Sequence, residues 1–168
     1  MPEIVCNTSP VQYLHQLGLL HLLPSLADRI TIPTAVAEEL DEGRRLGVSL
    51  PDVGTLACVT ILSPPQYAGA SFGDRFGARR DRGAGLGTRN GGDPIVILDE
   101  ALARRAAEFL GLRLTGTLGL LIDAKRKGVI PQVTPVLREL QALGFRVAGQ
   151  TRAAVLKLAG ESEGRRAG

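Results

Sequence analysis

Short apolar segments alternate with longer segments of helical periodicity along most of this chain. The segments EIVC (3–6), RITIP (29–33), LACVTIL (56–62) and PIVILD (94–99) are typical of buried strands, and LRLTGT (112–117) predicts a fifth strand. Strands that alternate with helices in this way pair in parallel and are covered by helices on both faces. The sequence therefore predicts an α/β protein with a parallel sheet.

The helical segments lie between and after these strands. Apolar residues at positions 11, 14, 17, 20 and 23 predict one helix that begins near Pro10, and Pro33-Thr34 begins a second helix with the sequence TAVAEELDEGRRLG. EALARRAAEFLG (100–111) follows the strand 94–99 and stops at a glycine. Three further helices are expected over residues 118–130, 131–143 and 151–160.

Composition excludes several classes of protein. Aromatic residues make up 4% of the chain and Trp is absent, so the core must be aliphatic. Two Cys and two His do not form a zinc-binding cluster, and no apolar segment is long enough to span a membrane. The start MPEIVCNTSP lacks the basic end and long apolar core of a signal peptide, which predicts a cytoplasmic protein.

Polar residues follow three of the expected strands. Asn7 follows the first strand, Asp99 ends the fourth, and Thr115-Gly116-Thr117 ends the fifth. The carboxyl ends of parallel strands meet at one edge of a sheet, where such proteins bind their ligands. We therefore expect these residues to lie close together.

Several stretches resemble the PIN-domain family. They are VCNTSP followed by YLHQLGLL, IPTAVAEEL, VILDEALARRAAEFLGLRLTGTLGLL and DAKRKGVIP, and together they cover most of residues 3–145. The chain is similar to a small prokaryotic branch related to VapC-type toxin ribonucleases. The resemblance implies a three-layer α/β/α sandwich with a mainly parallel sheet. We expect one domain over residues 1–148, with a C-terminal helix and tail over residues 149–168.

The activity that the resemblance implies is metal-dependent endonucleolytic cleavage of RNA in the cytoplasm. Phosphodiester hydrolysis needs an activated water and neutralisation of developing charge, which Mg²⁺ or Mn²⁺ supplies through carboxylate ligands. The family's first acid, in a D-T-S pattern, falls on Asn7 here, and an amide coordinates only through an uncharged oxygen. The second acid, in a V-x-x-E-L pattern, is Glu39, and the fourth is Asp99.

Both acids also have simpler interpretations. Glu39 could belong to an acidic solvated helix face, and Asp99 could be an ordinary helix N-cap. The resemblance further implies that Thr8, Ser9 and Thr117 support the metal ligands or contact phosphate. It also implies an RNA substrate, an antitoxin protein and a homodimer as partners, with no association with a membrane.

The third acid of the family is missing. It belongs to a G-E-x-E motif that opens an Ala/Leu-rich helix before the fourth strand. That place is taken by GDRFGARRDRGAGLGTRNGGD, residues 73–93. The window 66–93 holds five Arg against three Asp and so carries +2 of the chain's net charge of +3. Eight Gly in this window predict poor order over residues 66–92.

This stretch has three other interpretations. A basic arm that contacts RNA fits its arginines. A phosphate-binding glycine loop, and with it a nucleotide-binding domain, does not fit, because a preceding strand and a following helix are lacking. The third is a frameshift. Read one nucleotide on, degenerate codons for residues 75–92 permit DLGPGETEALALALETGG, which contains the expected motif and helix.

The frameshift hypothesis makes one direct prediction about the coding DNA. The shifted codon that spans Arg80 and Asp81 should read GAG, which restores the first glutamate of the motif. Resequencing the gene measures this, and any other triplet at that junction contradicts the hypothesis.

Overall fold

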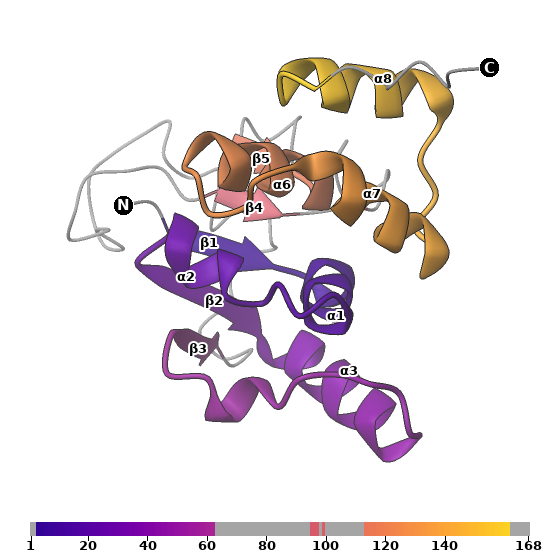
Figure 1. Cartoon of the computed structure of the whole chain (residues 1–168). Helices are drawn as coiled ribbons and strands as arrows, with labels where there is room; N and C mark the ends of the chain where they lie inside the picture. The colour runs from indigo at the N-terminus through magenta and orange to yellow at the C-terminus, as the bar shows by residue number, and fades with distance from the viewer. Residues whose placement is uncertain (1–2, 63–94, 98, 100–112, 162–168) are drawn as a thin grey trace. The chain divides into compact units, whose positions relative to one another are not determined.

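The computed structural model of the chain describes residues 3–62, 95–97, 99 and 113–161, and it contains one parallel sheet (Figure 1). The strand order is β3-β2-β1-β4-β5, and every neighbouring pair is parallel. The strands are β1 (Glu3–Cys6), β2 (Arg29–Pro33), β3 (Val59–Leu62), β4 (Ile95–Ile97) and β5 (Arg113–Thr115). The expected α/β class and parallel sheet are confirmed.

The central strands form the core of this sheet. Residues 4–6 of β1 and residues 30–32 of β2 are all buried, so both faces of these strands are covered. Consecutive buried residues are characteristic of parallel strands, in contrast to the alternation of a half-exposed sheet. The edge strand β3 differs, because Ile61 in it is 41% exposed.

Helices follow the strands in chain order (Figure 1). In the first part of the chain α1 packs on α3, α2 packs on β2, and α3 packs on β2 and β3. The helices are α1 (Thr8–Gln16), α2 (Leu22–Leu26), α3 (Thr34–Arg45), the short 3₁₀ helix η1 (Val53–Thr55), α6 (Thr117–Arg126), α7 (Val133–Ala142) and α8 (Gly149–Leu158). None of the described helices has the length and apolar character needed to cross a membrane.

The chain forms two compact units, residues 1–117 and residues 118–168. The first contains all five strands, and the second contains α7, α8 and all of α6 after its first residue. A single domain over residues 1–148 stays a prediction. The stretch 66–92, expected to be poorly ordered, and the helix expected over residues 100–111 lie outside the described residues.

The single helix expected after Pro10 is wrong, because the chain breaks it at Gly18. Gly18 has φ +68, a left-handed conformation that glycine adopts without steric cost. Its amide bonds the carbonyl of His15, and the amide of Leu19 bonds the carbonyl of Leu14. These bonds form a Schellman motif, which ends α1 although the apolar spacing continues into α2.

The third strand is shorter than expected. The prediction began it at Leu56, but β3 begins at Val59. The Leu56 amide bonds the carbonyl of Val53 and so closes η1, and its own carbonyl accepts from Val59. Local turn hydrogen bonds therefore occupy the backbone groups that an extended strand would have presented to β2.

Glu161 joins the ends of two helices in the second unit. A Schellman motif at Gly160 (φ +70) ends α8 and places Glu161 next. One carboxylate oxygen of Glu161 accepts from Nζ of Lys125 at 2.7 Å and from the Val133 amide at 2.6 Å. The other accepts from the Thr134 amide at 2.9 Å and from the Thr134 hydroxyl. The carboxylate thus caps the first amides of α7.

The Glu161 carboxylate is held in its charged form. Its side chain is 12% exposed, and burial alone raises the pKa. The four hydrogen bonds outweigh burial and lower the pKa from 4.5 to about 2. A lowered pKa in the folded state stabilises the fold above the unfolded value, and this stabilisation is lost as the pH falls from 4.5 toward 2.

The substitution Glu161→Gln should therefore reduce the free energy of unfolding at pH 7 by about 3 kcal/mol, since each pKa unit corresponds to about 1.4 kcal/mol. Urea unfolding at pH 7 measures this. The difference from the wild type should shrink as the pH is lowered through 4.5. Glu139→Gln is the control, because Glu139 is an exposed carboxylate on α7. Equal effects of the two substitutions would contradict the assignment.

Candidate metal centre

The register of the sheet brings two polar positions to the same edge. Cys6 at the end of β1 pairs with Ile97 at the end of β4, and Ile97 pairs in turn with Thr115 of β5. Asn7 follows Cys6 directly, and Asp99 lies two residues after Ile97. The two residues therefore follow the carboxyl ends of neighbouring strands.

Asp99 is fixed by the residue that begins α6. Its Oδ1 accepts from the backbone amide of Thr117 at 2.8 Å, and its Oδ2 accepts from the Thr117 hydroxyl at 2.5 Å. Thr117 is fully buried. Asp99 follows β4, whereas Thr117 follows the neighbouring strand β5. The carboxylate of Asp99 is therefore held by a residue that a different strand positions. Glu100, which is adjacent to Asp99 in sequence, lies outside the described residues.

Glu39 is held by the first turn of α1. The hydroxyl of Thr8 donates a hydrogen bond to Oε2 of Glu39, which lies on α3. α3 presents Glu39 in this way because Ala37 and Leu40 on its other side are buried in the core. Glu39 is itself exposed, so the carboxylate is open to solvent as well as to α1.

Glu39 differs from the other acids near the end of its helix. Asp41 pairs with Arg44 and Glu42 pairs with Arg45, both at 3.1 Å and three residues apart. These pairs are the solvated charge pattern of an ordinary helix surface. Glu39 has instead a hydroxyl from another helix as its partner. This contact favours a site residue over the simpler interpretation of Glu39 as part of an acidic face.

Asn7 carries a buried oxygen that no described residue satisfies. It is the N-cap residue of α1, yet its side chain makes no capping hydrogen bond. Its Oδ1 is buried and has no hydrogen-bond partner among the described residues. An N-cap Asn ordinarily accepts from an amide of the first turn, and a buried acceptor without a partner is costly. With respect to the described residues, the oxygen is therefore available to a further donor or to a cation.

Asp99 and Glu39 each interact with a sequence neighbour of Asn7, Cys6 and Thr8 respectively. Burial raises the pKa of the Cys6 thiol, and the negative charge of Asp99 raises it further. Asp99 is thus close enough for its charge to act on residue 6, while Glu39 bonds residue 8. No Lys or Arg forms a salt bridge with Asp99 or Glu39 within the described part of the chain. Uncompensated oxygens of this kind suit a hard cation.

The number of described acidic side chains that could bind a metal ion at this edge is nevertheless small. In residues 3–62, 95–97, 99 and 113–161, no three His, Cys, Asp or Glu side chains come together as a metal site. The neutral Asn7 replaces one acid, and the segment where the third acid was expected lies outside these residues. What remains is two carboxylates and one amide oxygen. Of the supporting hydroxyls, Thr8 and Thr117 each bond a carboxylate, whereas Ser9 makes no side-chain hydrogen bond to a described residue.

A parallel α/β sheet with polar and acidic residues beyond its strand ends is an arrangement in which such folds bind ligands. The family model DUF3368, described as a PIN domain, matches residues 3–67 and 86–161 of this chain. The chain belongs to this family. No curated protein and no solved structure matches it significantly. The interval 68–85 that the family model leaves unmatched lies within the atypical stretch 66–92, so the sequence departs from its family at the place where the third acid was expected.

The substitution Asn7→Asp tests whether position 7 lies close to the carboxylates of Asp99 and Glu39. In EDTA an added negative charge at the partly buried position 7, near Asp99, should lower the free energy of unfolding by about 1–3 kcal/mol. Saturating Mn²⁺ should reverse this loss, because the added charge strengthens cation binding. Thermal unfolding with and without Mn²⁺ measures both effects. Gln150→Glu adds the same charge at an exposed position on α8 and should show neither. If the Asn7→Asp variant is as stable as the wild type in EDTA, position 7 does not lie near the carboxylates of Asp99 and Glu39.

Proposed function

We propose that this protein is a PIN-domain ribonuclease of VapC-type descent with a weakened metal centre. The observation that carries this proposal is the Oδ1 of Asn7, which is buried and has no hydrogen-bond partner among the described residues. Its sequence neighbours are Cys6, on which the charge of Asp99 acts, and Thr8, which bonds Glu39. The proposed reaction is hydrolysis of an RNA phosphodiester bond. By the same resemblance we propose a cytoplasmic protein that forms a homodimer and pairs with an antitoxin.

The ligands of the proposed Mg²⁺ or Mn²⁺ ion are Asn7, Glu39 and Asp99. When bound, the ion supplies charge neutralisation and an acidified water. The protein's own contribution is to hold the ligand oxygens in place before the ion arrives. The two hydrogen bonds from Thr117 fix both oxygens of Asp99, and the Thr8 hydroxyl fixes one oxygen of Glu39. Such preorganisation removes part of the entropic cost of assembling a reactive site.

The centre is weaker than that of a chain with four acids. Asn7 contributes an oxygen but no negative charge, and the motif that would provide a third acid is absent from the sequence. Cation affinity in oxygen sites depends on the number of charged ligands. We therefore propose that the chain binds Mn²⁺ or Mg²⁺ weakly and cleaves RNA slowly.

A second candidate is a PIN-fold remnant that binds RNA or a protein partner without cleaving RNA. Two observations favour it: the neutral residue at the first ligand position and the family match that omits residues 68–85. The two candidates share their fold and differ only in whether the edge of the sheet holds a cation.

The test is Mn²⁺ binding by isothermal titration together with cleavage of a mixed pool of single-stranded RNA. We expect weak Mn²⁺ binding and slow, EDTA-sensitive cleavage by the wild type. Asp99→Asn should abolish both, because it removes a ligand charge while keeping a side chain of the same shape beside Thr117. Loss of cleavage should be at least about a hundredfold, the scale of one essential electrostatic group.

Asp123→Asn is the matched control. Asp123 lies on α6, pairs with Arg126 at 3.8 Å and is about half exposed, so its substitution should change neither binding nor cleavage. Circular dichroism establishes that each variant is folded. Mn²⁺ binding and cleavage that survive Asp99→Asn would overturn the proposed centre, and the absence of both in the wild type would establish the remnant.

A further inference from the structure

The charge of the protein is divided unequally between its two compact units. Residues 1–117 contain 11 Lys and Arg against 13 Asp and Glu, a net charge of −2. Residues 118–168 contain nine Lys and Arg against four Asp and Glu, a net charge of +5. The small net charge of the whole chain therefore conceals a strongly basic C-terminal unit.

The acids of this unit compensate little of that charge at the surface. The carboxylate of Glu161 is buried in its contacts with Lys125 and the start of α7. Asp123 is paired with Arg126 three residues later on the same helix. Among the described acids of this unit, only Glu139 has no ion pair.

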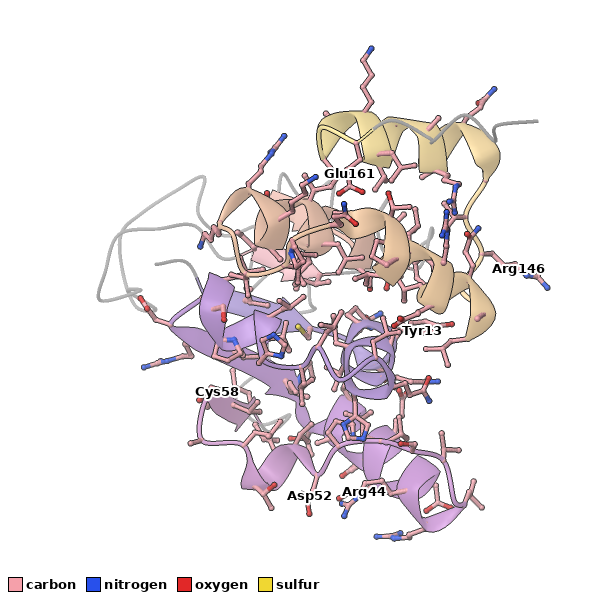
Figure 2. All side chains as sticks on the ribbon, in the orientation of Figure 1. Tyr13, Arg44, Asp52, Cys58, Arg146 and Glu161 are labelled. Carbon is pink, nitrogen blue, oxygen red and sulfur yellow. The ribbon has the colours of Figure 1, made fainter. Side chains whose placement is uncertain are left out.

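Three basic side chains of this unit have no interaction with a described residue. Arg138 lies on α7, Arg146 in the connection between α7 and α8, and Lys157 on α8. All three are exposed, and none forms a hydrogen bond or ion pair with a described residue. Figure 2 shows Arg146 extended away from the ribbon. Of the other described basic residues in residues 118–161, Lys125, Lys127, Arg126 and Arg152 each have an interaction within the chain.

The same unit lacks the groups that read nucleic-acid bases. It contains no Trp and no Tyr, and its one Phe, Phe145, is half-buried. Stacking on exposed aromatic rings is the usual means of holding unpaired bases. Exposed cations without such rings suit a polyanionic backbone in preference to particular bases.

We propose that the α7–α8 region, residues 133–158, binds the phosphate backbone of RNA through Arg138, Arg146 and Lys157. The choice of RNA rests on the proposed function, in which the metal centre acts on an RNA phosphodiester. Binding of RNA through these three side chains needs no divalent cation, so it is separable from cleavage. It is independent of RNA sequence and is weakened by salt, because phosphate contacts release bound counterions.

The test measures fluorescence anisotropy of a labelled 12-nucleotide single-stranded RNA in EDTA, with the full chain, over a series of KCl concentrations. The triple variant R138Q/R146Q/K157Q should bind at least about tenfold more weakly at low salt. The slope of log K against log[KCl] should become less steep by roughly 2, since each phosphate contact on a single strand contributes about 0.7. RNAs of different sequence should bind alike.

The control R29Q/R44Q/R45Q removes three exposed positive charges from the first unit and should leave the slope unchanged. Equal effects of the two triple variants, or no RNA binding by the wild type in EDTA, would overturn the proposal. Competition by polyglutamate at the same charge concentration as the RNA would also overturn it, in favour of an acidic protein partner. Because the assay is run in EDTA, it does not depend on a cation at Asn7, Glu39 and Asp99, so failure of the metal centre and failure of RNA binding by the three basic side chains give different results.

Discussion

The parallel pairing of β1 with β4 is the constraint on which the rest of the site depends. It places Asn7 and Asp99 after adjacent strand ends, although 92 positions separate them in the sequence. The next pairing, of β4 with β5, brings Thr117 to Asp99, and the end of β2 leads into the helix that carries Glu39. Four strands thus direct polar side chains to one edge, where a parallel sheet leaves space for a ligand.

Bringing acidic side chains together is electrostatically unfavourable, and this accounts for the hydrogen bonds and the neutral residue at this edge of the sheet. Carboxylates without cationic partners repel one another, and each is stabilised here by a hydroxyl or an amide instead. Asn7 adds no charge to that repulsion, and its Oδ1 has no partner among the described residues. A neutral residue at this position therefore adds no charge to be repelled when no cation is present.

Most of the fold could be predicted from local sequence patterns. The strands and most helices were expected within a few residues, because buried parallel strands are continuous apolar runs and surface helices have a clear period. The break between α1 and α2 was missed, since apolar spacing continues through Gly18 and only the left-handed backbone ends the helix. The role of Glu161 had no sequence signal, because its partners are more than 25 residues away.

The sequence by itself determined the α/β class, the family and the candidate ligands Asn7, Glu39 and Asp99. Each of these follows from residue type, periodicity or a short motif, all of which are local properties. Only the tertiary structure decided which hydroxyl holds which carboxylate, that no described residue bonds the Asn7 oxygen, and that Glu161 caps α7. These depend on atoms brought together by strand register and helix packing, and the free energy of a buried polar group depends on such neighbours.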